Sequence, residues 1–101
     1  MTSEQFIPAI EFCKLHHIDI SFIQTLHEYG LVEITTEEQT VFLHHDQLQQ
    51  VEQFARLHYE LKINMEGIDA IANLLQKVET LQEEIRILKG RLRNYENEQG
   101  Y

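Results

Sequence analysis

The sequence predicts a mostly α-helical protein in which a winged helix-turn-helix head is followed by a C-terminal coiled-coil helix. Three observations indicate this fold class: two short helical segments, a β-branched hairpin directly after them, and a heptad pattern near the end. The chain has 101 residues, which suits a single compact head. We expect residues 1–75 to form the head and residues 76–101 to continue it as the coiled-coil helix.

The helix-turn-helix unit is predicted between Pro8 and Gly30. Pro8 suits the first turn of a helix, and the apolar residues that follow it at helical spacing end at His16 and His17. The carboxylate of Asp19 can cap a second helix. Gly30 supplies the left-handed residue that ends this helix. Two short helices with a brief connection make a helix-turn-helix.

A β-hairpin, or wing, is predicted next. Leu31–Thr35 and Thr40–Leu43 are rich in β-branched and aromatic residues and flank a polar turn at Thr36–Gln39. A third helix then begins near Asp46, which we expect to act as its cap. Asn64 is expected to cap a fourth helix that continues toward the C-terminus.

The last helix carries the most regular pattern in the sequence. Steps of three and four residues alternate along a seam made of Ile71, Leu74, Val78, Leu81, Ile85, Leu88, Leu92 and Tyr95. Residues with β-branched side chains at the first core position and leucine at the second favour a two-stranded coiled coil. An isolated helix of this length is marginal in water, so we expect a homodimer through this seam. Folding of the seam back onto the head is the alternative.

The orientation of the two helices stays open. In a parallel pair, Glu84 would face Lys89 of the second copy, and Arg91 would face Glu96. The same charges also form local pairs, so an antiparallel arrangement stays open as the alternative.

Charge argues against a nucleic-acid partner. The chain has 17 acidic and 8 basic residues, a net charge of -9 with neutral histidines. Residues 1–60 contain ten acidic side chains and two basic ones, Lys14 and Arg56, a local charge of -8. A protein that binds duplex DNA needs a basic surface to contact the phosphates.

The remaining composition predicts a soluble cytoplasmic protein. No apolar run is long enough for a membrane span, and no leader segment is expected at the N-terminus. A single cysteine, Cys13, excludes an internal disulfide and suits a reducing compartment. We expect Cys13 to be a buried small hydrophobic residue.

Metal binding and catalysis find little support. The adjacent pairs His16–His17 and His44–His45 point in divergent directions on a helix or a strand. Cys13 has suitable spacing for a joint site with His16 or His17, but no second cysteine supports one. We find no nucleophilic triad and no phosphate-binding glycine loop, so we expect no cofactor, no metal and no enzymatic activity.

Several stretches together resemble the MerR-type winged-helix proteins and, more closely, the bacterial chaperone-modulator family CbpM. They are Glu11–Cys13, Gly30–Glu33, Arg56–Leu61, Gly67–Ile68, and Leu88 with Arg91–Leu92. The resemblance covers about residues 6–95. It implies a protein without enzymatic activity that binds the J-domain of CbpA, a DnaJ-like co-chaperone. It also implies that this binding restrains the co-chaperone and DNA-binding activities of CbpA.

A MerR-type DNA-binding transcriptional regulator is the alternative function. In such regulators the second helix carries an arginine and paired tyrosines that reach DNA, and the wing carries a further arginine. The positions here that line up are Gln24, Thr25 and Leu26 in the helix and Val41 in the wing. None of the four is cationic, which favours recognition of a protein.

The resemblance also suggests how the acidic residues could act. J-domains present a positively charged helix and an adjacent His-Pro-Asp loop to DnaK-type chaperones. A matching array of carboxylates could cover that docking face. The candidate partner-binding residues are Gln24, Glu28, Glu52, Glu60, Glu66 and Asp69. For each of them, a solvated helix face is the alternative role.

Overall fold

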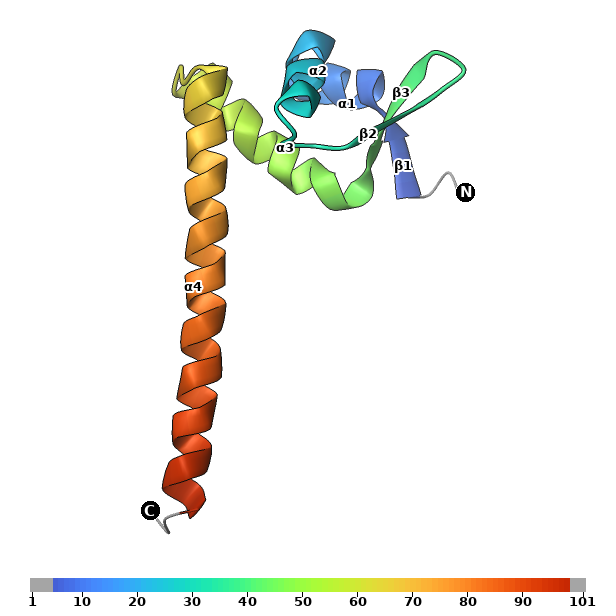
Figure 1. Cartoon of the computed structure of the whole chain (residues 1–101). Helices are drawn as coiled ribbons and strands as arrows, with labels where there is room; N and C mark the ends of the chain where they lie inside the picture. The colour runs from blue at the N-terminus through green and yellow to red at the C-terminus, as the bar shows by residue number, and fades with distance from the viewer. Residues whose placement is uncertain (1–4, 99–101) are drawn as a thin grey trace. The chain divides into compact units, whose positions relative to one another are not determined.

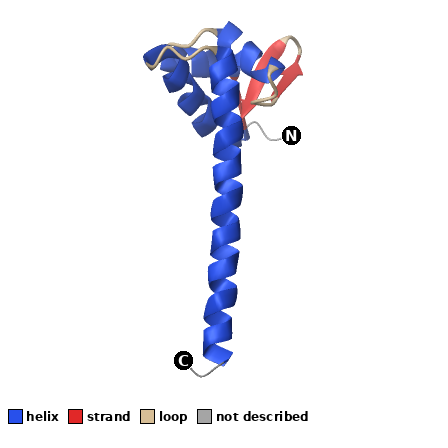
Figure 2. Ribbon diagram, turned by 60° about the vertical axis from the view of Figure 1, so that its left-hand side comes forward, coloured by secondary structure: helices blue, strands red, loops and turns tan. Residues whose placement is uncertain are grey.

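The computed structural model describes residues 5–98. In chain order, the elements are β1 (Phe6–Pro8), α1 (Ala9–His16), α2 (Ile20–Glu28), β2 (Ile34–Glu37), β3 (Thr40–His44), the 3-10 turn η2 (His45–Gln47), α3 (Leu48–Ala55), the π-helical turn η3 (Arg56–Glu60) and α4 (Met65–Glu98). The structure confirms a mostly helical chain with a small sheet and a long C-terminal helix, as Figures 1 and 2 show.

The chain divides into two compact units, one up to Asp69 and one from Ala70 onward. We call them the head and the tail. Helix α4 begins in the head and forms the tail. The head–tail boundary expected at residue 75 lies inside this helix and stays a prediction. Among residues 5–98, no helix is both long and apolar enough to cross a membrane.

Helix α1 begins one residue later than the sequence predicted. Pro8 is the last residue of β1 and takes the N-cap position, rather than a place in the first turn. The reason is that β1 pairs with β3, a long-range contact that three residues of sequence do not reveal. The predicted end at His16 is confirmed. His17 takes a left-handed backbone with φ 57°, and the N–H of Ile18 donates to the Cys13 carbonyl at 2.9 Å.

Helix α2 has the ends that the sequence predicted, with one correction. Asp19 occupies the N-cap position, but in the described part of the chain its carboxylate makes no capping hydrogen bond. Gly30 ends the turn after α2 with φ 75°. Its N–H donates to the carbonyl of His27, and the N–H of Leu31 donates to that of Leu26, both at 2.9 Å. This closure satisfies carbonyls that the helix end leaves free.

The wing, formed by β2 and β3, is part of a three-stranded antiparallel sheet with the order β1-β3-β2, in which β3 is the central strand. The predicted hairpin is present, but its turn is tighter than expected. Glu38 and Gln39 alone connect the strands, and both have positive φ, 50° and 67°. Two consecutive left-handed residues match the twist of a two-residue hairpin. Strand β2 therefore starts at Ile34, and the three residues from Leu31 precede it.

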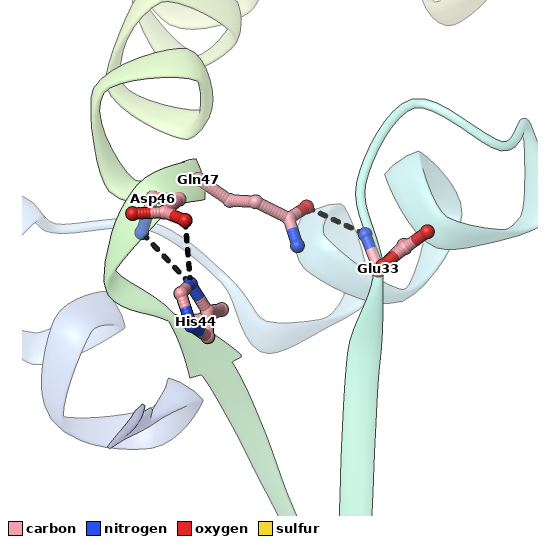
Figure 3. A network of polar contacts seen from close by, with 4 residues as sticks. All are labelled: Glu33, His44, Asp46 and Gln47. Atoms are coloured by element: carbon pink, nitrogen blue, oxygen red, sulfur yellow. Dashed lines mark hydrogen bonds and ion pairs between the residues drawn. The ribbon is translucent and has the colours of Figure 1, made fainter. Parts of the chain in front are cut away.

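A small polar network joins the entry of the wing to its exit (Figure 3). The side-chain oxygen of Gln47 accepts the N–H of Glu33 at 2.6 Å. The Nδ1 atom of His44 accepts the N–H of Asp46 at 3.1 Å, so His44 caps η2. The expectation that Asp46 is the cap is therefore wrong. Its carboxylate instead lies 3.4 Å from the same His44 nitrogen.

The predicted third helix is divided into three parts. It starts as the 3-10 turn η2, continues as α3 and ends as the π-helical turn η3. The N-terminal cap of α4 is confirmed. The Asn64 side-chain oxygen accepts the N–H of Gly67 at 2.8 Å, which satisfies one of the free donors of the first turn.

The core of the head is formed by helices and by the central strand of the sheet. Five side chains that are almost wholly shielded from solvent fill its centre: Ile23, Leu26, Leu43, Val51 and Ile68. They come from α2, β3, α3 and the first turn of α4. Helix α1 adds the buried side chains of Ala9, Phe12 and Cys13.

Candidate functional site

The head carries a groove of about 500 Å³ between the end of α1 and the helical segment formed by α3 and η3. We call it the α1–η3 groove. It is lined by His16, His17, Ile18, Glu52, Ala55, Arg56, Tyr59 and Glu60. Two of the six candidate partner-binding residues, Glu52 and Glu60, therefore share one groove.

The α1–η3 groove combines apolar surface with a charged rim. Ile18 is 7% exposed, and Ala55 is half-buried. Glu52, Arg56 and Glu60 are all exposed. Such a surface can hold the aliphatic stem of a long side chain while it pairs with the charged end. This combination suits recognition of a protein.

One carboxylate of the groove has a partner within the head. The Nε2 atom of His16 lies 3.3 Å from the Oε1 atom of Glu52, with both side chains partly exposed. Ion pairs this exposed contribute little stability, about 0–1 kcal/mol, and only when the histidine is protonated. Glu52 is therefore easily released to an incoming cation.

The η3 turn gives the groove its shape. The N–H of Leu61 donates to the Arg56 carbonyl at 3.2 Å, five residues back, rather than four as in an α-helix. Lys62 ends the turn with φ 60°, and its ammonium donates to the Tyr59 carbonyl at 3.0 Å.

An aromatic cluster fixes η3 against α2. The ring of Phe22 stacks on His58 at a centroid distance of 5.0 Å and meets Tyr59 edge-on at 5.4 Å. The Tyr59 hydroxyl oxygen accepts the N–H of Asp19 at 3.3 Å. His58 donates from Nδ1 to the carbonyl of Ile63 at 3.0 Å, because a carbonyl can only accept. The position of the groove residues is therefore held from two sides.

The other candidate partner-binding residues lie on two further surfaces. Gln24 and Glu28 are exposed on α2, one turn apart. Glu66 is exposed and Asp69 is partly exposed at the start of α4. None of these four residues lines the groove. Sequence reasoning missed His16, Arg56 and Tyr59 as groove residues, and the only signal for the last two was the resemblance over Arg56–Leu61.

The positions that correspond to the DNA-reading residues of MerR-type regulators offer little to DNA. Leu26 is fully buried. The hydroxyl of Thr25 donates to the Ser21 carbonyl of its own helix at 2.9 Å. Gln24 is exposed, but α2 contains no lysine or arginine, and Val41 in the wing is half-buried. The helix that would read DNA thus lacks the cations that phosphate contact requires.

A second hollow lies beside the wing, where Glu33, His44, Asp46 and Gln47 contribute to the lining. These are the residues of the network in Figure 3, and their polar atoms already contact one another. The hollow is therefore explained as a structural junction between β2 and η2. We place the candidate site in the α1–η3 groove.

The described residues form neither a metal site nor a reactive thiol. Across residues 5–98, no group of three or more potential ligands could hold a metal ion. Cys13 is buried, as the sequence predicted, at 5% exposure. Burial raises the pKa of its thiol above the ordinary value, and the Asp19 carboxylate raises it further. A protonated thiol is a poor nucleophile and a poor metal ligand.

The seam residues of α4 lie on a helix that is exposed along the tail. Ile71 is partly exposed, and the other seven, from Leu74 to Tyr95, are between 46% and 60% exposed. Glu83 and Arg86 form a two-bonded ion pair outside the seam. This pairing lowers the pKa of Glu83 and raises that of Arg86.

The fold and the surfaces described above define the class of protein to which the chain belongs. The model of the MerR helix-turn-helix family of regulatory proteins matches residues 7–90. This range includes the helix-turn-helix, the wing, the α1–η3 groove and most of α4. The head is thus a MerR-type helix-turn-helix domain.

A curated relative places the chain more narrowly. The chaperone modulatory protein CbpM of Pseudomonas putida (strain W619) is 32% identical over 81 residues, which are 79% of this chain and 80% of the relative. The chain belongs to the CbpM family of MerR-like proteins. The family descriptions are those of regulatory and modulatory proteins rather than enzymes. No solved structure matches the chain.

Proposed function

We propose that the protein is a chaperone modulator that binds the J-domain of a CbpA- or DnaJ-like co-chaperone. In this proposal it restrains the co-chaperone and DNA-binding activity by covering the face at which DnaK docks. The observation that carries the proposal is the relationship to a chaperone modulatory protein over 79% of the chain. The protein acts by binding alone, in the cytoplasm, where its single thiol stays reduced.

The charge of the head supports a basic protein partner. Ten acidic residues against two basic ones in residues 1–60 give a negative surface. The J-domain offers a positively charged helix, so attraction at long range would speed the encounter and orient it. Glu52 and Glu60 in the groove, with Glu66 nearby in sequence, supply exposed carboxylates for the docked complex.

Reversal of two of these charges tests the contact set. The variant Glu60→Lys/Glu66→Lys is titrated against a purified J-domain in a calorimeter, with Glu79→Lys as a control in the tail outside the seam. We expect the double reversal to weaken binding by at least about tenfold, since each reversal replaces attraction by repulsion. Glu79→Lys should leave the affinity unchanged. Unchanged affinity of the double variant would overturn the assignment of Glu60 and Glu66 to the interface. Failure of the wild type to bind the J-domain would overturn the proposed function.

A DNA-binding regulator is the competing function, because MerR-type proteins are described as regulatory. Gel retardation with random duplex at low salt separates the two, since even nonspecific DNA binders retain affinity there. We expect no retardation. A shift that disappears as salt is added would support the regulator instead.

We propose further that the protein is a homodimer, with the partner copy packed on the seam of α4. Seven exposed apolar side chains at heptad spacing, from Leu74 to Tyr95, support this partner. A second copy of the same helix would shield them from water along their whole length.

A further inference from the structure

Strand β2 pairs with β3 on one side only, because the strand order is β1-β3-β2. The two-residue turn of the hairpin makes Glu37 and Thr40 a hydrogen-bonded pair. Such pairs alternate along an antiparallel ladder, so Ile34 and Thr36 lie at positions that do not bond to β3. Their N–H and carbonyl groups point away from β3, and among residues 5–98 no hydrogen bond outside the sheet reaches them. We call this side of the strand the β2 edge.

The other edge of the sheet is protected, whereas the β2 edge is not. On β1, Pro8 lies opposite Phe42 at an outward position and has no N–H to offer. Proteins commonly block free strand edges with proline or lysine. Strand β2 contains neither residue type. It presents two N–H donors and two carbonyl acceptors, the groups through which an extended peptide adds a strand to a sheet.

The charge around the β2 edge indicates the kind of partner. Residues 31–47 contain no lysine or arginine and four carboxylates, all exposed: Glu33, Glu37, Glu38 and Asp46. In Figure 3 the carboxylate of Glu33 points away from Gln47. Among the described residues, no ion pair involves the three glutamates. A basic strand would meet opposite charges here, whereas a second copy of β2 would bring like charges together.

A hollow of about 610 Å³ adjoins β2 on one face of the sheet. Thr35 of β2, Phe6 of β1 and His44 of β3 line it from that face. The side chains of an added strand point alternately to the two faces, so every second one points to the side of the hollow. The lining also includes Glu33 and Asp46. An aromatic ring with nearby carboxylates suits a cationic side chain.

We propose that the β2 edge binds an extended basic segment of another protein, which adds a fourth strand to the sheet. The outward groups of Ile34 and Thr36 form the main-chain hydrogen bonds, and the carboxylates beside them select lysine or arginine side chains. The inference goes beyond the proposed function and does not depend on it, because no residue of the α1–η3 groove belongs to this edge.

Peptide binding to the full chain tests the edge. A capped, fluorescent hexapeptide of alternating arginine and valine is titrated by anisotropy, and a peptide with glutamate in place of arginine serves as control. We expect the glutamate peptide to bind at least about tenfold more weakly. Thr36→Pro removes an outward N–H without breaking the ladder and should weaken binding of the arginine peptide by at least about tenfold. Thr36→Val keeps the N–H and the β-branched shape and should bind within about twofold of wild type.

Two carboxylates next to the edge test the charge selection. Glu33→Gln/Glu37→Gln should weaken binding of the arginine peptide by about fivefold at low salt, since it removes two exposed ion pairs. Glu79→Gln makes the same chemical change in the tail and should leave the affinity unchanged.

Amide hydrogen exchange of the wild type locates the bound peptide. In the free protein the N–H groups of Ile34 and Thr36 should exchange quickly, and those of Thr35 and Glu37, which bond to β3, slowly. Saturation with the arginine peptide should slow exchange at Ile34 and Thr36 by at least about tenfold. Thr35 and Glu37 should change much less, because their N–H groups are already bonded.

The outcomes decide the proposal even if Thr36→Pro fails to fold, because exchange is measured on the wild type. No binding of the arginine peptide, or equal binding of the two peptides, would overturn it. Binding without slower exchange at Ile34 and Thr36 would also overturn it, since charge alone would then hold the peptide. Slow exchange of both groups in the free protein that becomes faster on dilution would show that a second copy occupies the edge.

Discussion

At the scale of single residues, left-handed backbone positions decide where the elements of the head stop. His17 and Gly30 each end a helix with positive φ, 57° and 75°. Only Gly30 has the residue type for which this conformation is free of steric cost. Both helices of the helix-turn-helix are therefore ended by a left-handed residue, which is favourable at Gly30 and unfavourable at His17.

One substitution at each left-handed position measures the conformational cost of a side chain there. Gly30→Ala should destabilise the protein by about 1 kcal/mol, or about 4–8 °C in Tm, because a side chain is forced into the left-handed region. The cost is conformational, since an added Cβ at Gly30 meets no other atom within 4 Å among the described residues. His17→Gly should stabilise by about 0.5 kcal/mol, the relieved strain less the added entropy of the unfolded chain. Denaturant unfolding compares all three proteins, and equal shifts for both variants would contradict the explanation.

The buried thiol of Cys13 predicts a loss of stability in mild alkali. Its pKa is raised, chiefly by burial, so the folded state holds the proton more tightly than the unfolded state. The stabilisation is complete below the ordinary thiol pKa and is lost as the pH rises through the folded pKa. The free energy of unfolding, measured by urea titration from pH 7 to 10, should decline above about pH 8.5.

The control for this prediction is Cys13→Ala. The substitution lowers stability at every pH, because it removes buried volume, but it should flatten the decline between pH 8 and 9.5. A decline of the same slope in both proteins would mean that other groups cause it.

At the scale of elements, the start of α4 shows how a local contact can reverse a general preference. Alanine is favoured over glycine in a helix by about 1 kcal/mol. At Gly67, however, a Cβ atom would lie 2.7 Å from Cγ2 of Ile63 and 3.1 Å from the capping oxygen of Asn64. At Gly90, in the same helix, a Cβ atom would have open space around it among residues 5–98.

The two glycines therefore predict effects of opposite sign. Gly67→Ala should lower the Tm of the head, since Ile63 or the Asn64 cap must shift, and loss of a cap costs about 1 kcal/mol. Gly90→Ala should increase the helical signal in circular dichroism and stabilise the tail by up to about 1 kcal/mol. Circular dichroism melts of both variants test this. Stabilisation by Gly67→Ala would show that the first turn of α4 relaxes freely.

Sequence patterns predicted most of the elements whose causes are local, although the cap expected at Asp46 is wrong, and they missed those whose causes are distant. The helix ends at His16 and Gly30, the cap at Asn64 and the hairpin follow from residue types near each position. Strand β1 depends on pairing with β3, which lies more than thirty residues later. The η3 turn has no sequence signal of its own, so the groove that Arg56 and Tyr59 line could not be predicted before the helices were placed.

The residues of the candidate site could likewise be predicted only in part from the sequence. Charge and family resemblance pointed to Glu52 and Glu60, which the fold brings into one groove. The roles of His16 and Tyr59 depend on contacts across the fold, at 3.3 Å to Glu52 and to Asp19 respectively. Such contacts follow from the packing of α1, α2 and η3 rather than from any spacing in the sequence.

At the scale of the whole molecule, the excess negative charge and the heptad seam lie in different parts of the chain. The head carries the excess of acidic residues, and the tail carries the unburied heptad seam. A fold that supports DNA binding in one protein can support protein binding in another, because function depends on the surface that the fold presents. The division predicts that partner binding and self-association respond to different substitutions.

Two adjacent residues of the tail test the self-association. Leu88 belongs to the seam and is 59% exposed, whereas Ile87, at 41%, lies outside it. Leu88→Asp places a charge in the expected dimer core and should weaken the dimer by at least about tenfold, because a charge buried without a partner is costly. Ile87→Asp makes the same chemical change next to it and should leave the dimer intact. Sedimentation over a range of concentrations reports the mass of each protein, and a monomeric wild type or equal effects of the two variants would contradict the seam.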